Sequence, residues 1–276
     1  QQFPLEADLG GAFDILDAAL EADLVARARD AVLVRAAADP TAPLGRAFAD
    51  LLADTGEAAV LAGLEALIGD RDLWLHWLRD AGTHEGVEAE LARALAVDPA
   101  TDDATLASAV LVSPDFPASY LGPLAEAWGA SGKQDLDQAA RLAVARDPAH
   151  PLDERVAAWT ALFLTQKGEP KAERSIAAKA AVARLPDIHE RAAREAARLL
   201  AIADARAALG TFRATRALLV LGDAVIGDYE AMKRARGVLD FDDLVGRTAD
   251  LLSRSDAAQW VQYKLDKGID HVLVDE

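Results

Sequence analysis

The chain has 276 residues, of which 52% are hydrophobic, and it carries a formal net charge of −17. This composition excludes a disordered chain, and the length allows one large domain or two ordinary ones. The absence of cysteine excludes disulfides and thiolate metal sites and fits a reducing compartment. The negative charge argues against a protein that mainly coats nucleic acid, because phosphate contacts require clustered Lys and Arg.

The sequence begins without a basic and apolar signal-like segment, and no uncharged apolar run approaches the length that crosses a bilayer. We therefore expect a soluble, cytoplasmic protein without membrane contact. Nearly all of the net negative charge lies in residues 1–150, whereas residues 151–276 are almost balanced.

Most of the sequence predicts helices. Alanine, leucine, arginine and glutamate dominate, and apolar residues recur with the 3.6-residue period. About a dozen helices are expected, and no signature recurs with the period of a helical solenoid. Proline- and glycine-rich breaks are predicted at residues 39–43, 68–72, 98–103, 113–117, 129–135, 147–151, 167–171 and 185–187.

Two features in the first half invite a functional interpretation. Trp74 and Trp77 lie three residues apart on one predicted helix, which favours core or interface anchors over a base-stacking platform. "GASGKQ" at residues 129–134 departs from the phosphate-loop pattern, since it has two residues between its glycines, Gln134 in place of Ser or Thr, and a helix before it. It is predicted to be a turn, so this chain alone is not expected to hydrolyse a nucleotide. The five histidines show no metal-binding spacing.

The stretch from Lys171 to Arg216 is locally basic. Its pattern favours a solvated helix face with pairs four residues apart, such as Glu190 with Arg194, over a surface that follows phosphates. Asp187 is a predicted N-cap. The longest helical pattern follows it to about Met232, with a break expected near Gly210.

"LDFDDL" at residues 239–244 places three acids at a predicted helix start, where they favour the positive end of the helix dipole. The three apolar residues between them are expected to pack inward. The acids are Asp240, Asp242 and Asp243, and the apolar residues are Leu239, Phe241 and Leu244.

"GIDHVLVDE" at residues 268–276 reads as a buried strand that delivers Asp275 and Glu276 at its C-terminal end. Nucleotide triphosphatases use such a pair beside the phosphate loop, where the Asp holds Mg²⁺ and the Glu accepts a proton from the attacking water. A lone strand forms no sheet, so its partners are expected outside this sequence or at its extreme N-terminus.

The segments "RGVLDFDDLVGRTADLL" and "WVQYKLDKGIDHVLVDE" together resemble the region that leads into motif II of superfamily 1 helicases of the UvrD/Rep type. The resemblance is closest to the AddA family, helicase-nuclease subunits of bacterial double-strand-break repair. The opening "QQFPLEADLGGAFDILDAALEADLVARARDAVL" and "FLTQKGEPKAERSIAAKAA" are also similar to AddA segments. In that family the strand continues as DEAQD, which implies that this sequence is cut inside the motif. Residues from about 40 to 150 carry no matching motif.

The resemblance implies an all-α fold, a multi-helix inserted domain (helicase 1B) with a short C-terminal return into an incomplete RecA-like α/β domain. Residues 1–12 would leave RecA-like domain 1A, residues 13–228 would form the 1B insertion, and residues 229–276 would return to domain 1A and end at motif II. The full-length parent would be an ATP-dependent DNA helicase and exonuclease in homologous recombination. It would use ATP and Mg²⁺ and act with DNA ends, single strands and an AddB-type partner subunit. This part alone is expected to be inactive and to bind neither cofactor.

The same resemblance assigns roles to individual residues. Asp275 matches the magnesium-associated acid and Glu276 the general base of the parent, whereas residues 240–243 match a DFDDL signature expected to act in packing and helix capping. The candidate DNA contacts of the basic stretch are Arg191, Arg194 and Arg198. The alternative is a helical protein–protein interaction scaffold without motor function, and a surface toward the partner subunit is equally compatible with the acidic first half.

Overall fold

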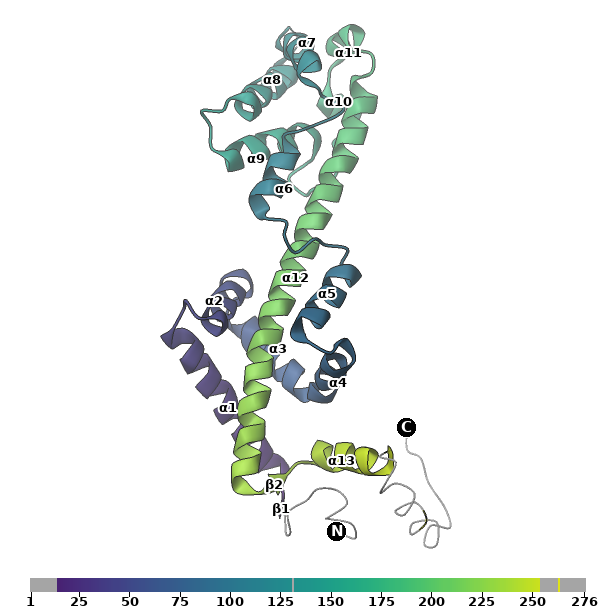
Figure 1. Ribbon diagram of the computed structural model, residues 1–276. Coiled ribbons are helices and arrows are strands. Elements are labelled where there is room, and N and C mark those ends of the chain that lie inside the picture. The colour runs from purple at the N-terminus through teal and green to yellow at the C-terminus, as the bar shows by residue number, and fades with distance from the viewer. Residues whose placement is uncertain (1–13, 131, 254–262, 264–276) are drawn as a thin grey trace. The chain divides into compact units, whose positions relative to one another are not determined.

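The computed structural model describes residues 14–130, 132–253 and 263 (Figure 1). Thirteen helices and two short strands make up these residues, which confirms the mainly helical fold for this part of the chain. None of the described helices is both long and apolar enough to cross a bilayer. In chain order the elements are β1 (Asp14–Ile15), α1 (Ala18–Ala38), α2 (Pro43–Thr55), α3 (Glu57–Gly69), α4 (Arg71–Ala81), α5 (His84–Ala94), α6 (Asp103–Val110), α7 (Ala118–Gly129), α8 (Lys133–Arg146), α9 (Leu152–Phe163), α10 (Glu173–Ile176), α11 (Lys179–Arg184), α12 (Ile188–Arg236), β2 (Val238–Leu239) and α13 (Phe241–Ser253).

The chain divides into two compact units. The predicted domain boundaries near residues 12 and 228 stay predictions. Unit 1 contains the described residues up to Glu88 and from Arg213 onward, and unit 2 contains residues Ala89–Phe212. Helix α12 therefore supplies its first part to unit 2 and its last part to unit 1. A stretch of the predicted insertion belongs to unit 1 because α1 and α3 share a core with the C-terminal part of α12.

The core of unit 1 follows helical periodicity. Leu24, Ala28 and Val32 recur every four residues along α1 and are fully buried. On α12, Leu221 and Val225 continue the same core. Burial of each large aliphatic side chain contributes about 1.5–3 kcal/mol, so these stripes are the main source of stability for unit 1.

Helix α12 is continuous over 49 residues, so the break expected near Gly210 is wrong. Leu209 and Phe212 on either side of this glycine are buried against Ala92, and this packing offsets the roughly 1 kcal/mol by which glycine disfavours a helix interior. The prediction of a long helix after Asp187 is confirmed, and it continues four residues beyond Met232.

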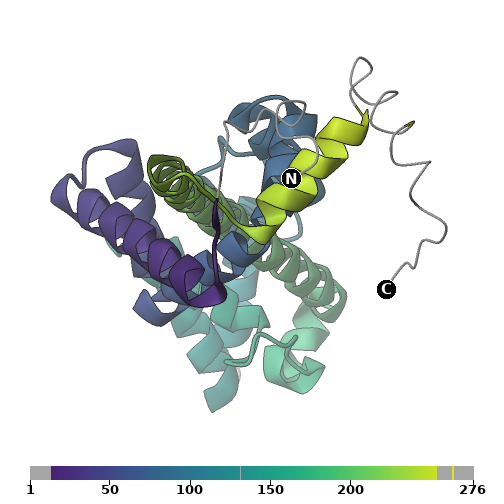
Figure 2. The same cartoon turned by 90° about the horizontal axis from the view of Figure 1, so that it is seen from below.

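Strands β1 and β2 form a two-stranded parallel sheet in unit 1. Asp14 is paired with Val238 and Ile15 with Leu239. The N–H of Leu16 also donates to the carbonyl of Leu239 over 2.8 Å. Figure 2 views this end of unit 1, with α1 in purple and α13 in yellow. The pairing brings together two segments separated by more than two hundred residues, since one precedes α1 and the other follows α12.

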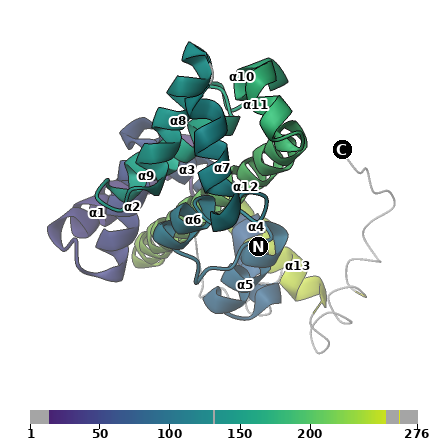
Figure 3. The same cartoon turned by 90° about the horizontal axis from the view of Figure 1, so that it is seen from above.

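Unit 2 has its own aromatic core. The rings of Phe116, Trp159 and Phe163 contact one another, and the centroid of Phe163 lies 4.9 Å from Phe116 and 5.5 Å from Trp159. Figure 3 shows α7, α8 and α9 of this unit beside the first part of α12. A buried carboxylate, Glu195, accepts hydrogen bonds from Trp159 Nε1 over 2.7 Å and from Ser113 Oγ over 2.6 Å. Unit 2 therefore has an aromatic core and a buried polar group of its own.

Candidate functional site: the Asp240 cluster

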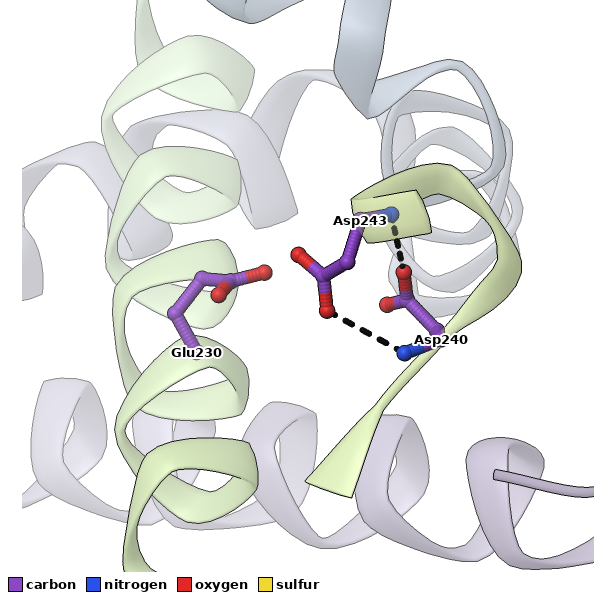
Figure 4. Close-up of side chains that lie close together, drawn as sticks. All are labelled: Glu230, Asp240 and Asp243. Carbon is purple, nitrogen blue, oxygen red and sulfur yellow. Dashed lines mark hydrogen bonds between the residues drawn. The ribbon is translucent and has the colours of Figure 1, made fainter. Parts of the chain in front are cut away.

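The candidate site lies in unit 1, where β2 ends and α13 begins. Asp240 is almost fully buried and caps α13, because its Oδ1 accepts a hydrogen bond from the N–H of Asp243 over 2.8 Å. Asp243 Oδ2 in turn accepts from the N–H of Asp240 over 3.1 Å (Figure 4). This reciprocal capping satisfies two amides at the helix start. The capping role expected for these two acids is confirmed.

The second carboxylate oxygen of Asp240 collects three donors from other helices. Tyr229 Oη and Lys233 Nζ, both on α12, lie 2.7 Å from Asp240 Oδ2. Arg71 Nη2, at the start of α4, lies 3.0 Å from the same oxygen. Because Arg71, Tyr229 and Lys233 are all buried, this carboxylate joins α4, α12 and α13 inside the fold.

Each of the two buried cations has further carboxylate partners. Lys233 Nζ also lies 2.6 Å from Glu230 Oε1 and 2.7 Å from Asp243 Oδ2. Arg71 Nη2 lies 2.5 Å from Asp242 Oδ2 and 3.7 Å from Glu21 Oε1. Two cations thus face five carboxylates. We name this group the Asp240 cluster, and its members are Glu21, Arg71, Tyr229, Glu230, Lys233, Asp240, Asp242 and Asp243.

The cluster fixes the charge of its members. Burial acts to raise the pKa of Asp240, but the hydrogen bond from Lys233 and those from Asp243 N–H and Tyr229 outweigh it and lower the pKa to about 2. Burial acts to lower the pKa of Lys233, yet its carboxylate partners raise it above the ordinary value. Burial and the hydrogen bond to Asp240 both raise the pKa of Tyr229. At neutral pH the site therefore holds a carboxylate, an ammonium and a neutral phenol.

The acids of the cluster have the composition of a metal site, but a lysine occupies the cation position. Glu230, Asp240 and Asp243 offer oxygens within 4.8 Å of one another. Since Lys233 Nζ contacts all three carboxylates, a positive charge of the chain already lies among them, at the place that an ion would take. The arrangement fits a structural ion cluster, because every acid and base in it is held by another member.

The expectation that Phe241 packs inward is wrong. Its side chain is 72% exposed, and Val245 one turn later is 53% exposed. Asp243 and Leu251 lie on the inward side of α13. Phe241 and Val245 lie on the opposite side of the helix and therefore point to solvent. Leu239 is buried as expected.

Two of the three arginines predicted as DNA contacts form ion pairs within unit 2. Arg191 Nε lies 2.6 Å from Asp187 Oδ2. Arg194 Nε lies 2.7 Å from Asp115 Oδ1, and its Nη1 lies 2.5 Å from Glu190 Oε1. The Glu190–Arg194 pair is the one that the sequence predicted. These contacts support the interpretation of the basic stretch as a helix face with internal pairs.

The third arginine, Arg198, is partly buried and contacts the interior of unit 2. Its guanidinium donates to Glu195, with Nη2 to Oε1 at 2.6 Å, and to the carbonyl oxygen of Val110 at 2.8 Å. Glu195 has no exposed side-chain surface. Arg198 therefore neutralises a buried charge, which gives it a structural role independent of any ligand.

The structure brings only part of the predicted site together. Asp275 and Glu276 lie outside the described residues, as do residues 1–12. Trp74 is buried in the core of unit 1 and meets Trp77 edge to face at 6.1 Å, and Trp77 is partly buried against the same core, as expected of core anchors. At "GASGKQ", α7 ends at Gly129 and α8 begins at Lys133, so a helix precedes this segment as predicted.

Sequence reasoning missed Arg71, Tyr229 and Lys233. A signal for two of them exists on α12, because Leu221, Val225, Tyr229 and Lys233 recur every four residues and all are buried. Lys233 continues an apolar stripe and is thereby distinguished from the exposed basic residues that follow it.

Comparisons of the chain with models of protein families, with curated proteins and with solved structures found no match.

Proposed function

We propose that this chain is the helical 1B region of an AddA-type superfamily 1 helicase-nuclease, with the segments that connect it to RecA-like domain 1A. The full-length protein would use ATP to move along DNA and would process broken duplex ends for recombination. Asp275 and Glu276 would then be the magnesium-associated acid and the general base of its ATPase. Their chemistry requires a phosphate loop that this chain does not supply.

The observation that carries the proposal is the parallel pairing of β1 with β2. A two-stranded parallel sheet of this length has little stability of its own. A larger parallel sheet that receives both strands would explain why a helical body begins and ends with adjacent strands. The cluster of buried charges beside β2 supports the same interpretation, since it fixes α13 within the proposed return to domain 1A.

In this proposal unit 2 is the arm that acts on DNA or on an AddB-type partner. It can be removed cleanly, because Glu88 Oε1 and Arg216 Nε lie 2.9 Å apart in unit 1 and hold the two connection points near each other. The experiment replaces residues 89–212 of the full-length protein by a short Gly-Ser linker. We expect DNA-stimulated ATP hydrolysis to persist and unwinding of forked duplex to fall. Unchanged unwinding would show that unit 2 is not the engaging arm.

The second candidate is a helical interaction scaffold without motor function. It is favoured by the internal partners of Arg191, Arg194 and Arg198, which leave these side chains little charge to offer to phosphates. A scaffold predicts that the longer protein binds a partner subunit but hydrolyses no ATP in the presence of DNA. The helicase predicts turnover under the same conditions, so one ATPase assay separates the two.

A further inference from the structure

Unit 2 contains a cavity of about 350 Å³ that nothing above assigns to a function. It lies where α8 and α9 meet the segment that follows α9. That segment, residues 164–171, folds back on itself through the antiparallel bridge between Leu164 and Pro170, and we call it the 164–171 hairpin. The polar residues lining the cavity are Arg141, Thr160, Thr165, Gln166 and Lys171. The described lining contains no carboxylate.

Two cations converge on one oxygen in this cavity. Lys171 Nζ donates to the carbonyl of Ala161, and Arg141 Nη1 lies 3.5 Å from the same oxygen. Ala161 is in the last turn of α9, where the helix dipole favours positive charge. A carbonyl oxygen carries only a partial charge, however, so most of the charge of the two cations is left uncompensated by this contact.

Lys171 is partly buried and Arg141 is exposed, and two other cations that are withdrawn from solvent have different partners. Arg198 and Lys233 each meet carboxylates at close range. For Lys171, burial disfavours the charged amine and Arg141 repels it, and both effects lower its pKa. The negative charge of an anion between the two cations would offset both effects on the pKa of Lys171, as expected of an anion site.

We propose that Arg141, Lys171 and the hydroxyl of Thr165 bind a phosphate group. Arg presents a planar fork of donors and Lys a point charge, a combination that suits a tetrahedral oxyanion. Thr165 Oγ1 already accepts the N–H of Glu169 over 3.2 Å, so its hydroxyl hydrogen remains to be donated. The cavity has the size of a small-ligand site. The phosphate has two sources, a free phosphate or the diester backbone of a nucleic acid, and the inference does not rest on the helicase proposal.

The test titrates the purified 276-residue chain at constant ionic strength with inorganic phosphate and, separately, with a single-stranded oligonucleotide lacking terminal phosphates. The variants are Lys171→Gln and Arg141→Gln. The matched control is Lys167→Gln, an exposed lysine of the same hairpin outside the cavity lining. We expect each cavity variant to weaken binding at least about tenfold, as loss of a charge-assisted hydrogen bond predicts, and the control to bind like the original chain.

The two arms distinguish the sources. Variant-sensitive binding of inorganic phosphate alone identifies a free phosphate or monoester, and variant-sensitive binding of the oligonucleotide identifies the backbone. Absence of binding in both arms overturns the proposal, as does an equal loss in the Lys167→Gln control.

A second measurement uses the unaltered chain, so it does not depend on the folding of any variant. Lysines are acylated with and without the bound ligand, and the modified peptides are quantified by mass spectrometry. We expect the ligand to slow modification of Lys171 severalfold relative to Lys167. Equal protection of both lysines, or of neither, contradicts a site at Lys171.

Discussion

Lys233 Nζ lies 2.7 Å from Asp240 Oδ2, and both side chains are almost fully withdrawn from solvent. A buried ion pair is costly to form and far more costly to break from one side, because the remaining charge loses its partner without regaining water. A single substitution of Lys233 or Asp240 is therefore expected to lower the stability of unit 1 more than most other substitutions.

Replacement of Lys233 by Met should destabilise unit 1 by about 3–5 kcal/mol, because Glu230, Asp240 and Asp243 lose their shared cation. The matched control is Arg234→Met, at the exposed next position of the same helix, which should change stability by less than about 0.5 kcal/mol. Urea unfolding followed by circular dichroism measures both. Equal effects of the two substitutions would refute the importance of the cluster.

The lowered pKa of Asp240 makes part of this stability depend on pH. The folded chain binds the Asp240 proton less tightly than the unfolded chain, because the pKa falls from its ordinary value of 3.8 to about 2. The contribution is therefore complete above about pH 4 and is lost as the pH falls toward 2. Asp240→Asn should be clearly less stable than the original chain at pH 6, and the difference should narrow between pH 4 and pH 2. A difference that stays constant over this range would contradict the assigned pKa.

Unit 2 offers a parallel comparison at Glu195, which is buried against Arg198, Trp159 and Ser113. Glu195→Gln should cost about 3 kcal/mol, because it removes the buried partner of a guanidinium. Glu190→Gln breaks only an exposed pair with Arg194 and should cost no more than about 1 kcal/mol. Thermal unfolding measures the loss of stability in each variant. A loss in Glu190→Gln as large as that in Glu195→Gln would be inconsistent with this structure.

The path of α12 through unit 1 depends on a close approach at Gly222. A Cβ at this position would collide with the side chain of Leu67 on α3, so Gly222→Ala should destabilise the chain by about 1–3 kcal/mol. Gly227 on the same helix has open space around the corresponding point, and Gly227→Ala should stabilise by up to about 1 kcal/mol. Opposite shifts in the melting temperature are expected, and shifts of the same sign would count against the packing described.

Local features of the fold could be predicted from the sequence. The helical period, the proline- and glycine-rich breaks between helices and the capping by acids at the start of α13 all depend on residues close together in the chain, and these expectations were correct. The prediction that Phe241 packs inward failed because an apolar residue in the first helical turn can lie on either face until the N-cap fixes the orientation of the helix. The prediction of a helix break near Gly210 failed because the packing of neighbouring residues outweighs the low helix propensity of glycine.

The partners of Asp240 could not be predicted in the same way. Arg71 is separated from Asp240 by 169 positions, and no local pattern connects them. Lys233 is nearer, and its place on the buried stripe of α12 was readable from the four-residue spacing. The identity of the acceptor, however, depends on how β2 pairs with β1, which is a long-range property of the fold.

The most direct test of the proposed function is ATP hydrolysis in the presence of forked DNA. We expect turnover by the full-length protein, its loss by at least about a hundredfold in the Glu276→Gln variant, and no turnover by the 276-residue chain, because general-base catalysis contributes about 10²–10⁴-fold and this chain has no phosphate loop. Robust turnover by the 276-residue chain, or full activity of the Glu276→Gln variant, would contradict the assignment to a helicase motor.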